Sequence, residues 1–133
     1  MHNIRKLREA GHATVADYKA ILAENVVFHS PVLIRPAEGR AVVAKIFATS
    51  TTLREGVYTG EWKLADRRTF LRWKGTIQGH ELESFDIIED NDEGLVIDRT
   101  IAFRPMPAAK LFRDAMRSAL GSSIPDDFWE YSN

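Results

Sequence analysis

Hydrophobic residues recur at helical spacing in the first part of the chain. A short basic stretch at 4–10 ends at Gly11, a residue suited to the left-handed cap of a helix. Thr14 and Asp17 then have the form of a capping box, and the apolar residues after them fall on one helical face. The pattern therefore predicts two helices, the second of which continues to about Asn25.

The next segment changes period twice. Residues 26–30 form a short β-rich run that Pro31 stops, and a loop follows up to Gly39. Helical spacing then returns, which predicts a third helix with one side facing the core. The residues expected on that side are Val42, Val43, Ile46, Phe47 and Leu53.

After Gly56 the pattern alternates with a period of two through four strand candidates separated by turn residues. Gln78 and Gly79 make one tight turn, and the acidic residues 90–94 make another. Alternation predicts one apolar face per strand, although the third strand, residues 80–89, has no cleanly apolar face. The residues expected to share the apolar faces include Tyr58, Gly60, Trp62 and Leu64, then Leu71 and Trp73, and finally Ile97, Arg99, Ile101 and Phe103.

A last helix is predicted from Pro107, which suits a first helical turn, to Gly121. The tail at 122–133 is polar, yet it carries Phe128 and Trp129. Burying one large aromatic contributes about 2 kcal/mol, which offsets much of the cost of ordering a few residues. We therefore expect the tail to fold back and dock these aromatics against its own domain or a dimer mate.

Helices followed by an antiparallel meander define an α+β fold rather than a parallel sheet. The length of 133 residues predicts one domain spanning 1–133, with its core at about 13–120 and a C-terminal tail at 122–133. A curved antiparallel sheet wrapped over the helices would form a cone that encloses a pocket.

Composition excludes several classes of function. The formal net charge is -1, so no overall positive field exists to hold nucleic acid. The chain has no cysteine, no paired histidines at metal-ligand spacing and no phosphate-binding glycine loop, so neither a metal nor a cofactor is expected. No signal peptide or membrane-length apolar run is visible, and we expect a cytoplasmic protein without membrane contact.

Four segments together resemble SnoaL-like members of the nuclear transport factor 2-like superfamily, over roughly residues 13–120. The resemblance implies a cystatin-like cone, a homodimer formed through the outer face of the sheet, and a pocket for a small apolar or polyketide-like molecule. Isomerases, cyclases, hydrolases and carriers share this scaffold, so the fold leaves the chemistry open. The segments are 25–32 (Asn-Val-Val-Phe-His-Ser-Pro-Val), Glu38-Gly39-Arg40, Ser84-Phe85-Asp86 and 94–105, which ends in Phe103-Arg104-Pro105.

The steroid isomerases of this superfamily supply a test of chemistry. Carried over by spacing, their general base falls on Ser30 and their oxyanion tyrosine falls near Lys6, neither of which fits the role. Only Asp86 matches, at the position of the isomerases' buried carboxyl, which stays protonated and donates a hydrogen bond to the oxyanion. The resemblance therefore does not support the isomerase mechanism, and Asp86 remains the best polar candidate.

Asp86 and Arg99 are expected to lie on the same inner face if the acidic turn closes a hairpin. They form either a clamp for a ligand carboxylate, carbonyl or hydroxyl, or a structural ion pair that binds nothing. His29 is a second catalytic candidate because histidine titrates near neutral pH, although its strand parity places it opposite Phe28 and Ser30.

The aromatic residues allow two classes of function. Phe28, Tyr58 and Trp62, with Trp73 and Phe103, are expected either to line a ligand pocket or to pack as plain core. Ser30, next to Phe28 in the chain, is expected among the ligand-binding residues as well. In the first class the protein binds or converts a mostly apolar small molecule by acid–base chemistry. In the second it is a non-catalytic dimeric interaction or carrier module whose cone is filled by its own side chains.

Overall fold

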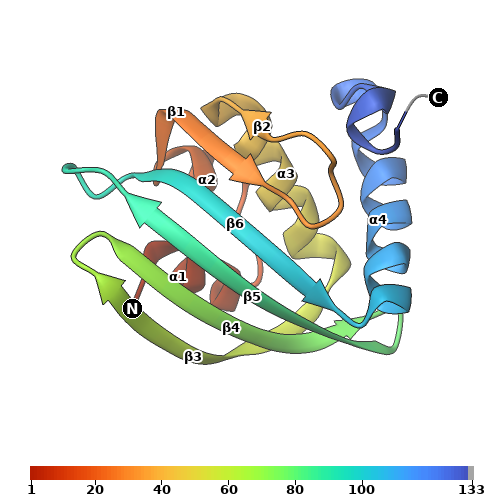
Figure 1. The fold of residues 1–133 in the computed structure, drawn as a ribbon, viewed down its shortest axis with the longest axis horizontal. Coiled ribbons are helices and arrows are strands. Elements are labelled where there is room, and N and C mark those ends of the chain that lie inside the picture. The colour runs from red at the N-terminus through yellow and green to blue at the C-terminus, as the bar shows by residue number, and fades with distance from the viewer. Residues whose placement is uncertain (132–133) are drawn as a thin grey trace.

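The computed structural model describes residues 1–131, in which four α-helices lie on one side of a curved, unclosed six-stranded sheet (Figure 1). The helices are α1 (Asn3–Ala10), α2 (Val15–Lys19), α3 (Arg40–Leu53) and α4 (Met106–Leu120). The strands are β1 (Leu22–His29), β2 (Ala37–Glu38), β3 (Glu55–Ala65), β4 (Arg68–Ile77), β5 (His80–Asp90) and β6 (Val96–Arg104). The predicted α+β fold, a cone of helices on a curved sheet, is confirmed.

The sheet has the strand order β2-β1-β6-β5-β4-β3. The predicted meander from β3 to β6 is antiparallel throughout. β1, however, runs parallel to β6, with Val27 beside Asp98, so the sheet is mixed rather than purely antiparallel. This parallel pair joins strands that are far apart in the sequence, and local hydrophobic patterns do not reveal such a pairing.

The observed helix boundaries agree with the prediction where capping residues mark them. They differ from it where an apolar run suits both a helix and a strand. Gly11 adopts the left-handed conformation after α1, with φ of 79°. Thr14 and Asp17 form the predicted capping box of α2 through two reciprocal hydrogen bonds of 2.9 and 3.2 Å. The predicted continuation of this helix to Asn25 is wrong. Leu22 instead pairs with Val96 at the start of β1 because sheet pairing outweighs the local helical spacing.

A bulge in β3 reverses the direction of its side chains. Tyr58 lies opposite Trp73 and Gly60 lies opposite Arg72, so Thr59 is the extra residue. Tyr58 therefore points into the core, whereas Trp62 points to the other side of the sheet and is 50% exposed. The prediction that residues 58–64 share one apolar face is wrong for this reason.

The core lies between the inner face of the sheet and the helices. Leu71, Trp73 and Ile88 contribute to it from the sheet, and the fully buried Val43 and the nearly buried Phe47 contribute from α3. The opposite side of the sheet, which we call the outer face, is not covered by any helix of residues 1–131 (Figure 1). No helix in this range is long and apolar enough to cross a membrane.

The tail folds back along α4 through two 3₁₀ turns, Gly121–Ser123 and Asp126–Phe128 (Figure 1). Trp129 is 3% exposed, and the amide of Ile34 donates a hydrogen bond of 2.8 Å to the carbonyl of Phe128. The predicted docking of Phe128 and Trp129 on their own domain is confirmed. Tyr131, the last described residue, is exposed. Residues 132 and 133 lie outside the described residues.

Candidate functional site

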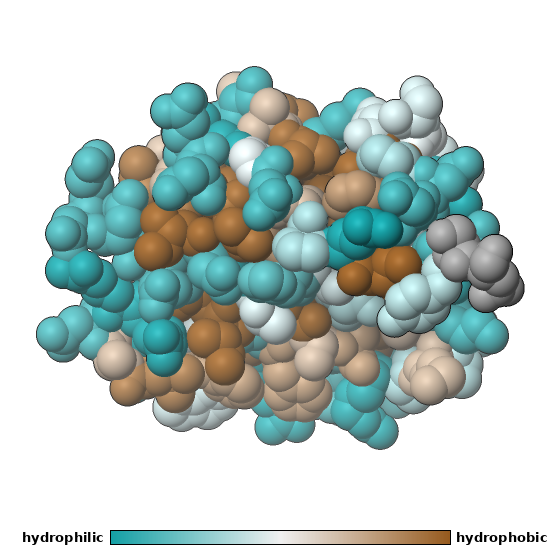
Figure 2. Space-filling view, turned by 45° about the horizontal axis from the view of Figure 1, so that its top comes forward, coloured by the Kyte–Doolittle hydropathy of each residue, from teal (hydrophilic) through white to brown (hydrophobic). Residues whose placement is uncertain are grey.

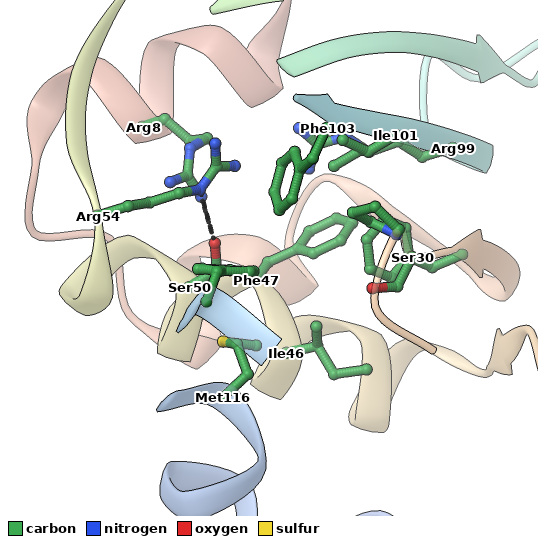
Figure 3. Close-up of a pocket in the computed structure, with 13 residues that line it drawn as sticks. Arg8, Ser30, Ile46, Phe47, Ser50, Arg54, Arg99, Ile101, Phe103 and Met116 are labelled. Atoms are coloured by element: carbon green, nitrogen blue, oxygen red, sulfur yellow. Dashed lines mark hydrogen bonds between the residues drawn. The ribbon is translucent and has the colours of Figure 1, made fainter. Parts of the chain in front are cut away.

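The interior of the cone holds a cavity of about 20 Å³, enough for about one water molecule (Figure 3). Phe47 and Ser50 of α3, Arg99 and Phe103 of β6, and Met116 of α4 contribute to its lining. The predicted pocket is therefore present only as a small cavity, because the surrounding side chains fill most of the space that the fold encloses.

Asp86 and Arg99 form an ion pair beneath this cavity. Arg99 Nε donates to Asp86 Oδ2 at 2.7 Å, and the two side chains are 2% and 1% exposed, respectively. Across the β5–β6 hairpin, Asp86 lies opposite Ile101 and Arg99 lies opposite Ile88, so the pair meets diagonally on the inner face. The expected juxtaposition of these two residues is therefore present.

The pair leaves one oxygen free. Asp86 Oδ1 is buried and accepts no hydrogen bond. Burial is the largest single influence on the pKa of Arg99 and acts to lower it. The charge and hydrogen bond of Asp86, together with smaller contributions from Tyr58 and Tyr18, outweigh burial and leave that pKa above its ordinary value. The guanidinium also lies 4.8 Å from the centre of the Phe47 ring. Asp86 thus compensates the buried charge of Arg99 and holds its side chain in place.

Arg54, which the sequence did not single out, fills the space above the cavity (Figure 3). It follows the last residue of α3 and is 6% exposed, with its guanidinium 4.3 Å from the centre of the Trp73 ring and 5.3 Å from that of Phe103. Arg54 Nε donates to Ser50 Oγ at 3.2 Å, whereas its Nη1 is buried without an acceptor. Burial, and after it the charge of Arg8, lowers the pKa of Arg54 well below its ordinary value.

Arg8 of α1 stands beside Arg54, and Figure 3 shows both guanidinium groups next to Ser50. Arg8 Nη1 donates to Ser50 Oγ at 3.3 Å, and Arg8 Nε is buried without an acceptor. These two arginines, which we call the arginine wall, line the inner cavity and also an outer cleft of about 400 Å³ between α1, the end of α3 and β3. Tyr58 and Trp73 line the outer cleft as well.

A helical pattern in the sequence contains the signal for Arg54. Val43, Phe47 and Ser50 share the buried face of α3, and Arg54 continues that spacing by four residues beyond Ser50. An arginine placed on an apolar helical face, rather than at its edge, indicates a buried charge. Arg8 gives no comparable signal because its stretch of chain is basic throughout.

The other residues predicted for the site divide between the two sides of the sheet. Phe28, Ser30 and Phe103 line the cavity, although the Ser30 hydroxyl already accepts a hydrogen bond of 3.2 Å from the amide of Val32. His29 points to the outer face, where its Nε2 lies 3.2 Å from Asp98 Oδ2. The assignment of His29 as a catalytic partner of Asp86 is corrected, because strand alternation places these side chains on opposite sides.

Trp62, which was predicted to line the pocket, does not line it either. The bulge at Thr59 turns it to the outer face, where its ring centre lies 5.5 Å from that of Phe70. Phe70 in turn lies 6.4 Å from Phe85 of the neighbouring strand. These three aromatic rings thus belong to the outer face and have no part in the cavity.

Comparisons with known proteins support the architecture. No family model matches the sequence, and no curated protein matches it. Among solved structures, a protein with a cystatin-like fold from Silicibacter pomeroyi shares 24% identity over 90% of this chain and 86% of its own, with a TM-score of 0.81. A steroid delta-isomerase from Pseudomonas aeruginosa shares 25% identity over 92% of this chain and 95% of its own, with a TM-score of 0.75.

A member of the SnoaL-like family from Agrobacterium tumefaciens, assigned as an isomerase, shares 16% identity over 77% of this chain and 95% of its own, with a TM-score of 0.61. Together these likenesses define a cystatin-like α+β cone of the kind in which isomerases occur. The chain thus shares its fold with SnoaL-like and nuclear transport factor 2-like structures, the fold that the sequence resemblance implied.

Proposed function

We propose that this protein binds a small, mostly apolar molecule between the inner face of the sheet and helices α3 and α4. The observation that carries this proposal is the arginine wall, because the flexible side chains of Arg8 and Arg54 line both the inner cavity and the outer cleft. An arginine has four rotatable side-chain bonds and moves at a far lower cost than a packed aromatic plug. Displacing Arg54 would join the two spaces.

The joined space suits a molecule with a largely apolar body. Ligand pockets commonly enclose about 300–1,000 Å³ and combine apolar walls with a few polar groups. The outer cleft supplies most of this volume, and the aromatic faces of Trp73, Phe103 and Phe112 that Arg54 now covers would become its wall. The likeness to a steroid delta-isomerase supports an apolar ligand.

Asp86 is the group that any acid–base conversion of the bound molecule would use. Arg99 orients its carboxylate through Oδ2, which leaves Oδ1 as the free acceptor. The isomerase base position holds Ser30, whose hydroxyl is engaged by the Val32 amide, so the proposal does not include the steroid isomerase mechanism. Binding is the primary proposed activity, and conversion at Asp86 depends on it.

Methionine methyl groups provide a direct test of binding. Met116 is buried and lines the cavity, whereas Met1 and Met106 are exposed and do not line it, so they serve as internal controls. With methyl-labelled protein, titration with 2-naphthol should produce a saturable shift of the Met116 methyl resonance and leave the other two unchanged. Equal, unsaturable shifts at all three methyl groups, or none at Met116, would contradict the proposal.

The outer face of the sheet favours a second role, which we propose is the interface of a homodimer. Trp62, Leu64 and Ile87 are each about half exposed on this face, beside the rings of Phe70 and Phe85. Figure 2 shows hydrophobic side chains interleaved with hydrophilic ones on the surface of the molecule. Apolar surface of this kind, edged by charges such as the Arg68–Glu89 pair, is typical of protein interfaces.

We expect light scattering at micromolar concentration to give the mass of a dimer. Trp62→Arg should convert it to a monomer, because a charge would then be buried without a partner at the interface. Met106→Lys, a matched change at an exposed residue of α4, should leave the dimer intact. A monomeric wild-type protein would refute the proposed interface.

A further inference from the structure

The interior of the cone carries more positive than negative charge. Arg8, Arg54 and Arg99 all line the cavity, and Asp86 neutralises only Arg99. Within residues 1–131, no carboxylate forms an ion pair with Arg8 or Arg54. Two acidic residues border the outer cleft, but Glu9 already pairs with Arg5 at 2.7 Å and Glu55 is exposed.

Hydrogen-bond donors without acceptors cluster at the same place. Arg54 Nη1 and Arg8 Nε are buried and unpaired, and both side chains converge on the oxygen of Ser50 (Figure 3). A hydroxyl that accepts two N–H groups still has its own proton to donate. The cluster therefore offers three donors from three side chains and no remaining acceptor.

Such a cluster is unfavourable unless another molecule completes it. A guanidinium stays protonated in proteins, so the pKa of Arg54, depressed by burial, expresses the cost of keeping this charge in the core. The faces of Trp73 and Phe103 compensate a part of that cost. The repulsion between Arg8 and Arg54 remains, and an anion placed between them would turn it into attraction.

We propose that Arg54, Arg8 and Ser50 bind the carboxylate of the small molecule, whose apolar body extends toward Phe103 and Met116. This inference rests on the proposed function and names the chemical class of its ligand. A carboxylate matches the planar, forked donors of a guanidinium. A phosphate dianion fits less well, because its dehydration beside the aromatic rings costs more than that of a monoanion.

The test compares benzoate, its neutral isostere benzamide, and inorganic phosphate. Benzoate should raise the melting temperature of the wild-type protein saturably and shift the Met116 methyl resonance. Benzamide should bind about ten- to hundredfold more weakly, because charge-assisted hydrogen bonds are lost. Phosphate should compete only at much higher concentration than benzoate.

Arg54→Met should abolish the preference for benzoate over benzamide. Its melting temperature without ligand should stay the same or rise, because an uncompensated buried charge is replaced by an apolar side chain. Arg113→Met, which removes a surface arginine that contacts Asp114, should bind benzoate like the wild type. Arg8→Gln, at a partly exposed position, should weaken benzoate binding even if Arg54→Met does not fold.

Each other outcome overturns a defined part of the inference. If benzamide and benzoate shift Met116 at equal concentrations, the pocket stands but the carboxylate site does not. If phosphate binds more tightly than benzoate, the ligand class is wrong. If Arg8→Gln and Arg54→Met both keep the preference for benzoate, the anion binds elsewhere. If benzoate and benzamide leave Met116 unchanged while 2-naphthol shifts it, the carboxylate site fails and the pocket stands. If none of the three affects Met116, the proposed function fails together with this inference.

Discussion

Asp86→Asn is expected to lower the free energy of unfolding by about 3–5 kcal/mol, because it leaves the buried Arg99 guanidinium without its counter-charge. Arg99 is 2% exposed and forms its ion pair, at 2.7 Å, with this carboxylate. Urea denaturation of both proteins, with similar dependence on denaturant, would measure the difference. The same change tests whether the pair holds the fold or is free to serve a ligand.

Two further variants separate these roles. Asp86→Leu combined with Arg99→Met should regain most of the lost stability, since an apolar pair of similar volume often replaces a buried ion pair without cost. Asp98→Asn, which breaks the exposed pair with His29, should change stability by less than about 1 kcal/mol. A loss below about 1 kcal/mol for Asp86→Asn would show that Arg99 does not depend on Asp86.

Trp129→Ala is expected to destabilise the protein by about 3–5 kcal/mol, the usual cost of removing a buried large aromatic side chain. Trp129 belongs to the main buried cluster together with Val32 and Phe112, and it borders a surface hollow between residues 31–34 and α4. Its indole Nε1 is buried without an acceptor, which places the expected loss toward the lower end of that range. Thermal and urea denaturation would both report it.

Tyr131→Ala is the matched control, because Tyr131 lies two residues further along the same tail and is exposed. It should leave the melting temperature unchanged. Equal stability of Trp129→Ala and the wild type would mean that the tail contributes no packing energy, contrary to the burial of its indole ring.

Much of the fold could be predicted because local signals and tertiary structure agree. The Thr14–Asp17 box, the left-handed Gly11 and the period-two strands appear where the pattern predicted them. The predictions failed where one residue changes the parity. Thr59 adds a bulge that turns Trp62 outward. A bulge has no strong sequence signature, so alternation alone does not reveal it.

The candidate site was predicted in part for a similar reason. Asp86 and Arg99 were found because both lie on one hairpin, whose turn residues set the register. The helical spacing of α3 indicates that Arg54 is buried, but not that Arg8 lies beside it. The two arginines meet only when α1, the end of α3 and the sheet come together, and no local pattern relates residues so far apart. The nearly filled cone has the same origin, since side-chain conformations decide the volume that remains.

The parallel pairing of β1 with β6 affects when Asp86 and Arg99 are buried during folding, and therefore the folding rate. Hairpins from β3 to β6 join neighbouring segments, whereas Val27 meets Asp98 across roughly 70 residues, so we expect β1 and α3 to dock late in folding. Asp86 and Arg99 would then form their pair in a solvated hairpin and lose their hydration only as the cone closes. Dehydration would raise the folding barrier, so a variant with apolar residues at both positions should fold faster than the wild type.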